Sequence, residues 1–220
     1  MSATDGSSRP SHREHWDERH AAEAPIESRE PDPILIEEIK GLRPGRALDL
    51  GTGDGRNAVW LATQGWKVTA VDFSSVALDR GRMLAKARRV DVEWELVDLL
   101  EWMPPAGAFD LVALFFIHLP PDERRGVYAR AAAAVASGGT LLIVGHDRTN
   151  LTDGVGGPQD PDLLFTPNEI VTELHGFTVV RAQALRRSSP DEPGPIDAVV
   201  SAVRAEGGAI TTHWAHDTRE

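Results

Sequence analysis

The chain has 220 residues, of which 41% are hydrophobic and 26% are charged, and its formal net charge at pH 7 is −11. This composition is typical of one soluble globular domain, and the acidic balance argues against nucleic acid as a partner, because nucleic-acid binding depends on a basic surface. The chain contains no cysteine, which excludes disulfide bonds, zinc–thiolate sites and cysteine nucleophiles.

The N-terminal segment, residues 1–31, is polar, and we expect a partly disordered arm with a short helix around the stretch HWDERH. Its first fifteen residues contain no apolar run, so we expect no signal peptide. The longest strongly apolar run, residues 111–117, is too short to span a bilayer. We therefore expect a cytoplasmic protein that does not contact a membrane.

From residue 32 onward, segments with helical periodicity alternate with short apolar segments that are typical of strands. Asp32 and Pro33 are suited to begin the first helix, and Thr166 and Glu169 have the spacing of a capping box. Residues 145–165 show little periodicity and predict a long loop. The predicted helices occupy residues 32–42, 57–65, 74–89, 120–137 and 166–176, and the predicted strands occupy residues 46–50, 66–72, 92–98, 109–117, 140–145, 177–185 and 196–204.

This alternation predicts a doubly wound α/β fold, with helices on both faces of a seven-stranded, mostly parallel sheet. No helical pattern separates the last two strands, so we expect them to pair with each other antiparallel, and the last strand to run against the rest. We expect one domain at residues 32–204, between the arm at residues 1–31 and a flexible C-terminal tail at residues 205–220.

The stretch LDLGTGDGRN, residues 48–57, is a glycine-rich turn that follows a predicted strand. A dinucleotide site requires a further glycine where Arg56 stands, and Asp49 would repel a pyrophosphate. Asp72 and Asp98 end the next two predicted strands, so three acids meet at one edge of the sheet. A ligand with a ribose and a cationic amino-acid end fits these acids better than a dinucleotide does.

The stretches LDLGTGDGRN, VTAVDFS, WELVD, FDLVALFFIHLPP and SGGTLLIVG resemble, in order and spacing, those of the class I S-adenosylmethionine-dependent methyltransferases. The resemblance covers residues 16–204. The stretch GRNAVWLATQGWKVTAVDFS is most similar to the bacterial tellurite-resistance and thiopurine-type enzymes, which methylate small molecules. The resemblance implies a Rossmann-like methyltransferase fold, with S-adenosyl-L-methionine as cofactor and S-adenosyl-L-homocysteine as product.

The resemblance also implies a role for each matching residue. The backbone of Gly51 and Gly53 would lie against the methionine end of the cofactor, Asp72 would bind the ribose diol, and Asp98 would bind the adenine amino group. Trp16 would cover the sulfonium as part of a lid. The alternative interpretation of Trp16 is an exposed aromatic side chain on the N-terminal arm. The implied cofactor-binding residues are Trp16, Asp49, Gly51, Thr52, Gly53, Gly55, Asn57, Asp72, Phe73, Asp98, Leu99 and Phe115.

Methyl transfer from a sulfonium is an in-line displacement that depends mainly on positioning, and it needs a general base only when the acceptor keeps its proton at neutral pH. The candidate catalytic residues are His118 and His146. The alternatives are a turn residue that caps the following helix for His118, and a solvated loop residue for His146.

We expect a small-molecule acceptor, with a thiol, a selenol or a metalloid oxyanion favoured by family likeness. An oxygen or nitrogen of a natural-product or quinone-like metabolite is the alternative. An NAD(P)-binding oxidoreductase and a non-catalytic cofactor-binding protein are the other classes of function. We expect no nucleic-acid partner and no metal, and a monomer or a homodimer. The histidines at positions 12, 15 and 20, and at positions 213 and 216, are interpreted as solvated.

Overall fold

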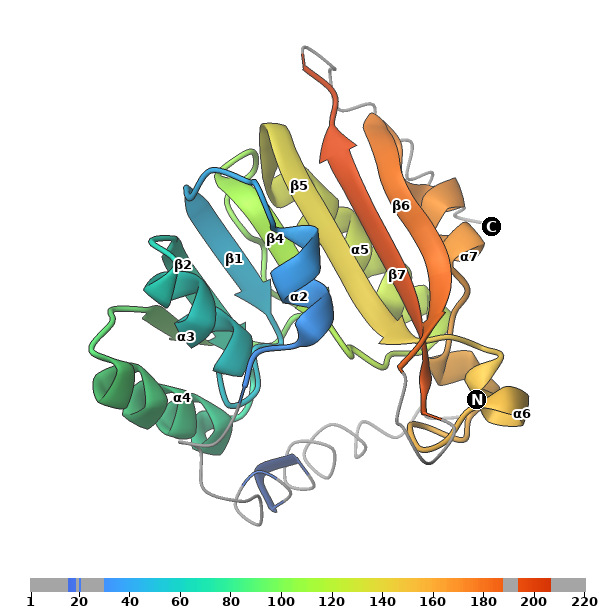
Figure 1. Ribbon diagram of the computed structural model, residues 1–220, viewed down its shortest axis with the longest axis horizontal. Coiled ribbons are helices and arrows are strands. Elements are labelled where there is room, and N and C mark those ends of the chain that lie inside the picture. Colours follow the sequence, from blue (N-terminus) through green and yellow to red (C-terminus); the bar gives the residue numbers. More distant parts are fainter. Residues whose placement is uncertain (1–15, 19, 21–29, 188–193, 207–220) are drawn as a thin grey trace, which may run out of the picture.

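The chain forms one seven-stranded sheet in a computed structural model that describes residues 16–18, 20, 30–187 and 194–206 (Figure 1). The strand order is β3-β2-β1-β4-β5-β7-β6. The first five strands are parallel, whereas β7 runs antiparallel to both β5 and β6. The strands are β1 (Arg46–Leu50), β2 (Lys67–Asp72), β3 (Glu93–Leu96), β4 (Phe109–Phe115), β5 (Val135–His146), β6 (Phe177–Arg186) and β7 (Ile196–Arg204).

Helices cover both faces of this sheet, as Figure 1 shows for α2 and α3 on the near side and α5 on the far side. Two apolar clusters lie under these layers. One cluster joins Leu48 of β1 to α5 and α7, and the other joins Ala47 to α2 and α3. Adjacent residues of one strand thus point to opposite layers. The helices are α2 (Pro33–Glu38), α3 (Arg56–Thr63), α4 (Ser75–Arg88), α5 (Pro121–Ala134), α6 (Asn150–Asp153) and α7 (Pro167–Glu173).

This architecture confirms the predicted fold class, including the antiparallel last strand. Among the described residues, no helix has the length and apolar character needed to cross a membrane. The predicted arm at residues 1–31 and tail at residues 205–220 lie mostly outside the described residues.

The predicted boundary between the helix at residues 120–137 and the next strand was wrong. The helix ends at Ala134, and β5 begins at once with Val135. Val135 pairs with Phe109 of β4, and its carbonyl oxygen accepts a hydrogen bond from the Arg204 guanidinium at 2.6 Å. Pairing with neighbouring strands therefore overrides the helical preference of the alanine-rich run.

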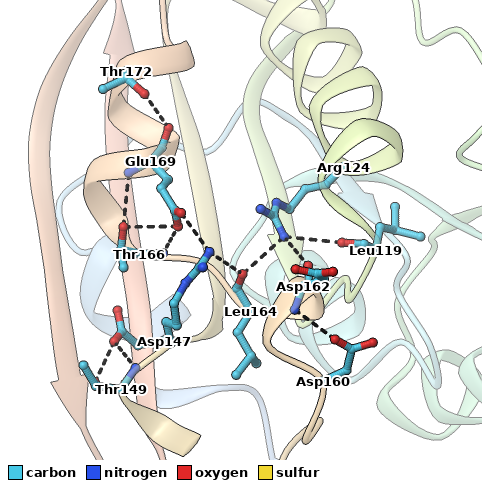
Figure 2. A network of polar contacts seen from close by, with 11 residues as sticks. Leu119, Arg124, Asp147, Thr149, Asp160, Asp162, Leu164, Thr166, Glu169 and Thr172 are labelled. Carbon is cyan, nitrogen blue, oxygen red and sulfur yellow. Dashed lines mark hydrogen bonds and ion pairs between the residues drawn. The ribbon is translucent and has the colours of Figure 1, made fainter.

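The segment from Gly145 to Phe165, predicted as a long loop, contains the short helix α6 and a 3-10 turn at Pro161–Leu163. Several of its carbonyl oxygens accept hydrogen bonds from arginine side chains. Arg124 is buried and donates hydrogen bonds to the carbonyl oxygens of Leu119, Asp162 and Leu164, at 3.2–3.4 Å (Figure 2). One guanidinium therefore joins the start of α5 to the end of this segment.

The helix that follows starts as the sequence predicts. Thr166 and Glu169 form the capping box, with the Glu169 carboxylate accepting a hydrogen bond from the Thr166 backbone at 2.6 Å. Arg148 donates to the same carboxylate at 2.8 Å, which ties α7 to the segment after β5 (Figure 2). The chain that passes the carboxyl end of β5 is thus fixed at both of its ends.

Candidate functional site

A cavity of about 1170 Å³ lies at the carboxyl ends of the parallel strands. It sits beside β1 and β4, where the strand order reverses, and ligands of doubly wound sheets bind at such a point. The cavity contains both predicted catalytic histidines and all but one of the predicted cofactor-binding residues. The residues that were predicted from the sequence as site residues and that line the cavity are Trp16, Asp49, Gly51, Thr52, Gly53, Asn57, Asp72, Phe73, Asp98, Leu99, Phe115, His118 and His146.

The glycine turn after β1 forms one wall of the cavity. Gly51 has a φ of +65°, and a Cβ atom built on it would lie 2.1 Å from the end of the Ile117 side chain, so a side chain at this position would be strained and would displace Ile117. Gly55, the predicted residue that does not line the cavity, packs against Trp94 and Gly81 instead and begins α3. The turn thus exposes its backbone on one side and fixes a helix on the other.

Asp49 lies at the base of this wall and is buried. Its carboxylate accepts a hydrogen bond from the Thr52 hydroxyl at 2.6 Å. Burial raises the pKa of Asp49 to about 7, and the nearby carboxylate of Asp72 contributes to the rise, against the lowering effects of Thr52 and Arg56. A carboxyl group in this state is suited to a ligand with a positive charge, because such a ligand favours its ionised form.

Asp72 ends β2 and holds the tip of the glycine turn. One carboxylate oxygen accepts a hydrogen bond from the Gly53 backbone at 2.8 Å, and the other accepts one from the Ser74 backbone at 2.9 Å. Burial raises the pKa of Asp72, although these backbone hydrogen bonds oppose the shift. Phe73, the next residue, also lines the cavity. The acid and the aromatic are therefore presented by one turn.

The loop after β3 places Asp98 and Leu99 in the cavity wall. The Asp98 carboxylate accepts a hydrogen bond from the Leu100 backbone at 2.9 Å. Arg130 of α5 donates to the carbonyl oxygens of Leu99 and Leu100, at 2.6 and 3.2 Å. No sequence pattern indicated this role for Arg130, since α5 is remote from the loop along the chain.

Replacing Arg130 with alanine is expected to weaken S-adenosylhomocysteine binding about tenfold. Both hydrogen bonds come from one partly exposed guanidinium nitrogen, so we count them as a single bond from a charged donor, which contributes about 1.5 kcal/mol and corresponds to a factor of about ten. Isothermal titration calorimetry measures the change. Arg125→Ala is the control, because Arg125 lies on the same helix but contacts Asp122 and Glu173 on the surface. Equal losses in both variants would contradict the role of Arg130.

The described part of the N-terminal arm also reaches the cavity. The rings of Trp16 and His20 stack with their centroids 5.8 Å apart, and His20 is 8% exposed and lines the cavity. Asp17 accepts a hydrogen bond from the hydroxyl of Ser74. The interpretation of His20 as solvated was therefore wrong. The other histidines of the two predicted solvated groups, at positions 12, 15, 213 and 216, lie outside the described residues.

The opposite wall holds the two candidate catalytic histidines. The imidazole rings of His118 and His146 are nearly parallel, with an interplanar angle of 6° and centroids 5.3 Å apart. The centroid of the Phe116 ring lies 5.2 Å from that of the His146 ring. The backbone of Phe116 has a φ of +57°, which is unusual for a residue with a side chain. The alternative of a solvated loop residue was wrong for His146, which ends β5 with its side chain 13% exposed.

Two further residues of this wall were missed by the sequence analysis. Asp197 of β7 is fully buried, and its carboxylate lies 3.0 Å from Nδ1 of His146. Arg187 donates to the other oxygen of Asp197, and its guanidinium lies over the Phe116 ring, 4.9 Å from the centroid. The one signal in the sequence was an acid within the apolar stretch IDAVV, which a buried strand accepts only when the acid is paired.

Comparison with known proteins shows what the chain is similar to. A family model described as a methyltransferase domain matches residues 47–139. This part of the chain is thus similar to the methyltransferases. The match spans β1 to the start of β5, and it includes the glycine turn with Asp49 and Asp72.

Characterised relatives of this chain act on different molecules. The 2-heptyl-1-hydroxyquinolin-4(1H)-one methyltransferase of Mycobacteroides abscessus is 24% identical over 153 residues, which cover 66% of this chain and 67% of the relative. The trans-aconitate 2-methyltransferase of Rhizobium meliloti is 30% identical over 165 residues, which cover 72% of this chain and 54% of the relative. The chain thus spans about half the length of the second relative.

A solved structure that concerns the conversion of a disulfide bond into a thioacetal group during echinomycin biosynthesis has the same fold as this chain. It superposes with a TM-score of 0.69 over 90% of this chain and 93% of its own length, at 21% sequence identity. At this identity the likeness extends to the fold alone.

Proposed function

We propose that the protein transfers a methyl group from S-adenosylmethionine to a small molecule. The observation that carries the proposal is the row of buried acids, Asp49 and Asp72, beside the exposed backbone of Gly51 in one cavity at the switch point of the sheet. A pocket for one drug-sized molecule measures about 300–1,000 Å³. The cavity of about 1170 Å³ has room for the cofactor and a small acceptor.

The residues present fit the cofactor. Asp72 would hold the ribose diol, Asp98 and the Leu99 backbone would contact the adenine, and Phe73 would lie against its ring. Asp49 would favour the ammonium group, and Phe115 would flank the sulfonium. When bound, the cofactor supplies an activated methyl group, so the remaining task of these residues is to orient it and to exclude water.

We propose in addition that the arm at residues 1–31 acts as a lid over the domain at residues 32–204. The position of Trp16 and His20 in the cavity wall supports this role. An aromatic ring over a cation contributes about 1–2 kcal/mol when the contact is dry.

Two classes of acceptor remain as proposals. Family likeness favours a soft nucleophile, such as a thiol, a selenol or a metalloid oxyanion, which needs no base. The pair of imidazoles in the cavity favours the alternative, an oxygen or nitrogen acceptor that must lose a proton. The name of the relative from Mycobacteroides abscessus, which includes a hydroxyl group on a quinolinone, is consistent with this alternative.

A thermal-shift titration of the full chain with S-adenosylhomocysteine, NAD and NADP tests the proposed function. At a hundred times its dissociation constant, a ligand stabilises the native state by about 2.7 kcal/mol. We expect S-adenosylhomocysteine alone to raise the melting temperature. A rise with NAD or NADP alone would contradict the proposal and favour an oxidoreductase. Binding of S-adenosylhomocysteine without methyl transfer to any acceptor would favour a non-catalytic role.

A further inference from the structure

The acceptor side of the cavity contains an arrangement that a soft nucleophile does not require. His146 of β5 and Asp197 of β7 are direct cross-strand partners in the antiparallel ladder, and their side chains lie 3.0 Å apart. Asp197 is completely buried, and its second oxygen accepts a hydrogen bond from Arg187. A buried acid with both oxygens engaged holds its partner imidazole in one orientation.

The state of Asp197 determines which nitrogen of His146 is free to accept a proton. Burial by itself would raise the pKa of Asp197, but the hydrogen bonds from His146 and Arg187 outweigh burial, and this pKa lies below its ordinary value. The ionised carboxylate can only accept hydrogen bonds, so Nδ1 of His146 donates to it. In the neutral imidazole, Nε2 is then the nitrogen with a lone pair.

Nε2 of His146 lies beside Gly157, where a side chain would cover it. Gly157 passes close to the ring, and a Cβ atom built on it would lie 2.5 Å from Cδ2 and 2.9 Å from Nε2 of His146. Both residues line the cavity. The charged and titratable groups that face His146 are Asp197, Arg187 and the stacked ring of His118.

The shape of this wall favours a flat molecule. The rings of Phe116, His118 and His146 gather within 5.2–6.3 Å of one another, and the guanidinium of Arg187 lies over the Phe116 face. Stacked rings and a nearby positive charge suit an aromatic hydroxyl compound, whose oxygen becomes negative as its proton leaves.

We propose that His146 is the general base for an aromatic hydroxyl acceptor, with Asp197 and Arg187 as positioning residues. This inference rests on the proposed methyltransferase function. In the step, the acceptor oxygen forms a bond to the transferred methyl carbon, and the bond from that carbon to sulfur breaks with its electron pair left on sulfur. The hydroxyl proton moves to Nε2 of His146, and it leaves to water after the product departs.

The test compares aromatic hydroxyl compounds with their thiol counterparts, such as 2-naphthol with 2-naphthalenethiol. A thiol of this kind is largely ionised near pH 8 and needs no base, whereas a phenolic hydroxyl with a pKa of about 10 does. We expect the wild-type protein to methylate aromatic hydroxyl compounds of this kind. In His146→Gln, which keeps a donor for Asp197, kcat on a hydroxyl acceptor should fall about 10²- to 10⁴-fold, with transfer to the thiol changed less than about threefold.

Two further variants separate catalysis from structure. Asp197→Asn should lower kcat on the hydroxyl acceptor while its KM and the affinity for S-adenosylhomocysteine stay near wild type. His175→Gln, which replaces an exposed histidine outside the cavity, should change nothing. Equal losses on hydroxyl and thiol acceptors in His146→Gln would overturn the base assignment and indicate a structural role. Wild-type protein that binds S-adenosylhomocysteine and methylates thiols but no hydroxyl compound would overturn the acceptor class.

A second readout does not depend on turnover. 2-Naphthol bound to the complex with S-adenosylhomocysteine, which has no methyl group to transfer, can be titrated by the absorption of its anion. The anion should appear at a lower pH in the wild-type protein, where Nε2 of His146 can take up the hydroxyl proton, than in His146→Gln. The same titration midpoint in both proteins would overturn the inference. Absence of S-adenosylhomocysteine binding would instead count against the proposed function itself, so the two failures are distinguishable.

Discussion

Replacing Asp72 with alanine is expected to weaken the binding of S-adenosylhomocysteine by about 10²- to 10⁴-fold, as measured by isothermal titration calorimetry. In the proposed complex the carboxylate accepts hydrogen bonds from both ribose hydroxyls, and each bond to a charged group contributes about 1.5–3 kcal/mol. Two such bonds correspond to this range of dissociation constants.

The ribose contact can be separated from damage to the turn. Asp72 also accepts hydrogen bonds from the backbone of Gly53 and Ser74, so Asp72→Asn serves as a milder second variant. An analogue of S-adenosylhomocysteine that lacks both ribose hydroxyls should bind wild type and variant with similar, weak affinity. Asp79→Ala removes an exposed acid of α4 and should leave affinity unchanged. If a variant at Asp72 lost affinity by the same factor for S-adenosylhomocysteine and for the analogue without ribose hydroxyls, the assignment of Asp72 to the ribose would be contradicted.

Asp49→Asn is expected to weaken the binding of S-adenosylhomocysteine by about 10- to 100-fold at pH 7.5, and to abolish the rise in affinity that Asp49 causes between pH 6 and about 7.5. The pKa of Asp49 is raised to about 7 by burial, so the free wild-type protein holds a proton there at lower pH. A ligand ammonium favours the ionised carboxyl, and wild-type affinity should therefore rise as the pH increases from 6 to about 7.5. At strongly alkaline pH the ligand amino group also loses its proton, and the affinity should fall again.

The stability of the ligand-free protein should change with pH in the opposite direction to its ligand affinity. This change is an independent check on the role of Asp49. A carboxyl group with a pKa of about 7 in the folded state, against 3.8 as its ordinary value, destabilises the fold as the pH rises from about 4 to 7. Asparagine cannot ionise and can still accept from Thr52. We therefore expect Asp49→Asn to melt at a higher temperature than wild type at pH 8 without ligand. A lower melting temperature together with unchanged affinity would contradict the role of Asp49.

Much of the fold was predictable because its signals are local. Alternating helical and apolar segments predict a doubly wound sheet, and acids at the ends of successive strands must meet at one edge when those strands are parallel. The capping box of Thr166 and Glu169 lies within four residues and was predicted directly. The glycine turn was predictable for the same reason, because a positive φ at Gly51 is a property of the residue type.

The features that were missed depend on contacts between distant parts of the chain. The end of α5 is decided by the pairing of Val135 with β4, which no local propensity encodes. The burial of His20 depends on its packing beside Gly53. Asp197 and His146 are 51 residues apart and meet through the antiparallel register of β5 and β7. A shift of that register by one residue would turn Asp197 to the other face, so the pair could be found only with the strand pairing known.

The cavity wall divides by chain segment, and this division bears on how such a protein changes over evolutionary time. Asp49, Asp72, Asp98 and the glycine turn come from residues 49–98, whereas the two candidate catalytic histidines, Phe116 and Arg187 come from residues 116–187. Substitutions in the later segment can therefore remodel the acceptor pocket without disturbing the earlier one. A lineage can change its substrate while keeping its methyl donor, and a laboratory library directed at residues 155–158 explores that same freedom.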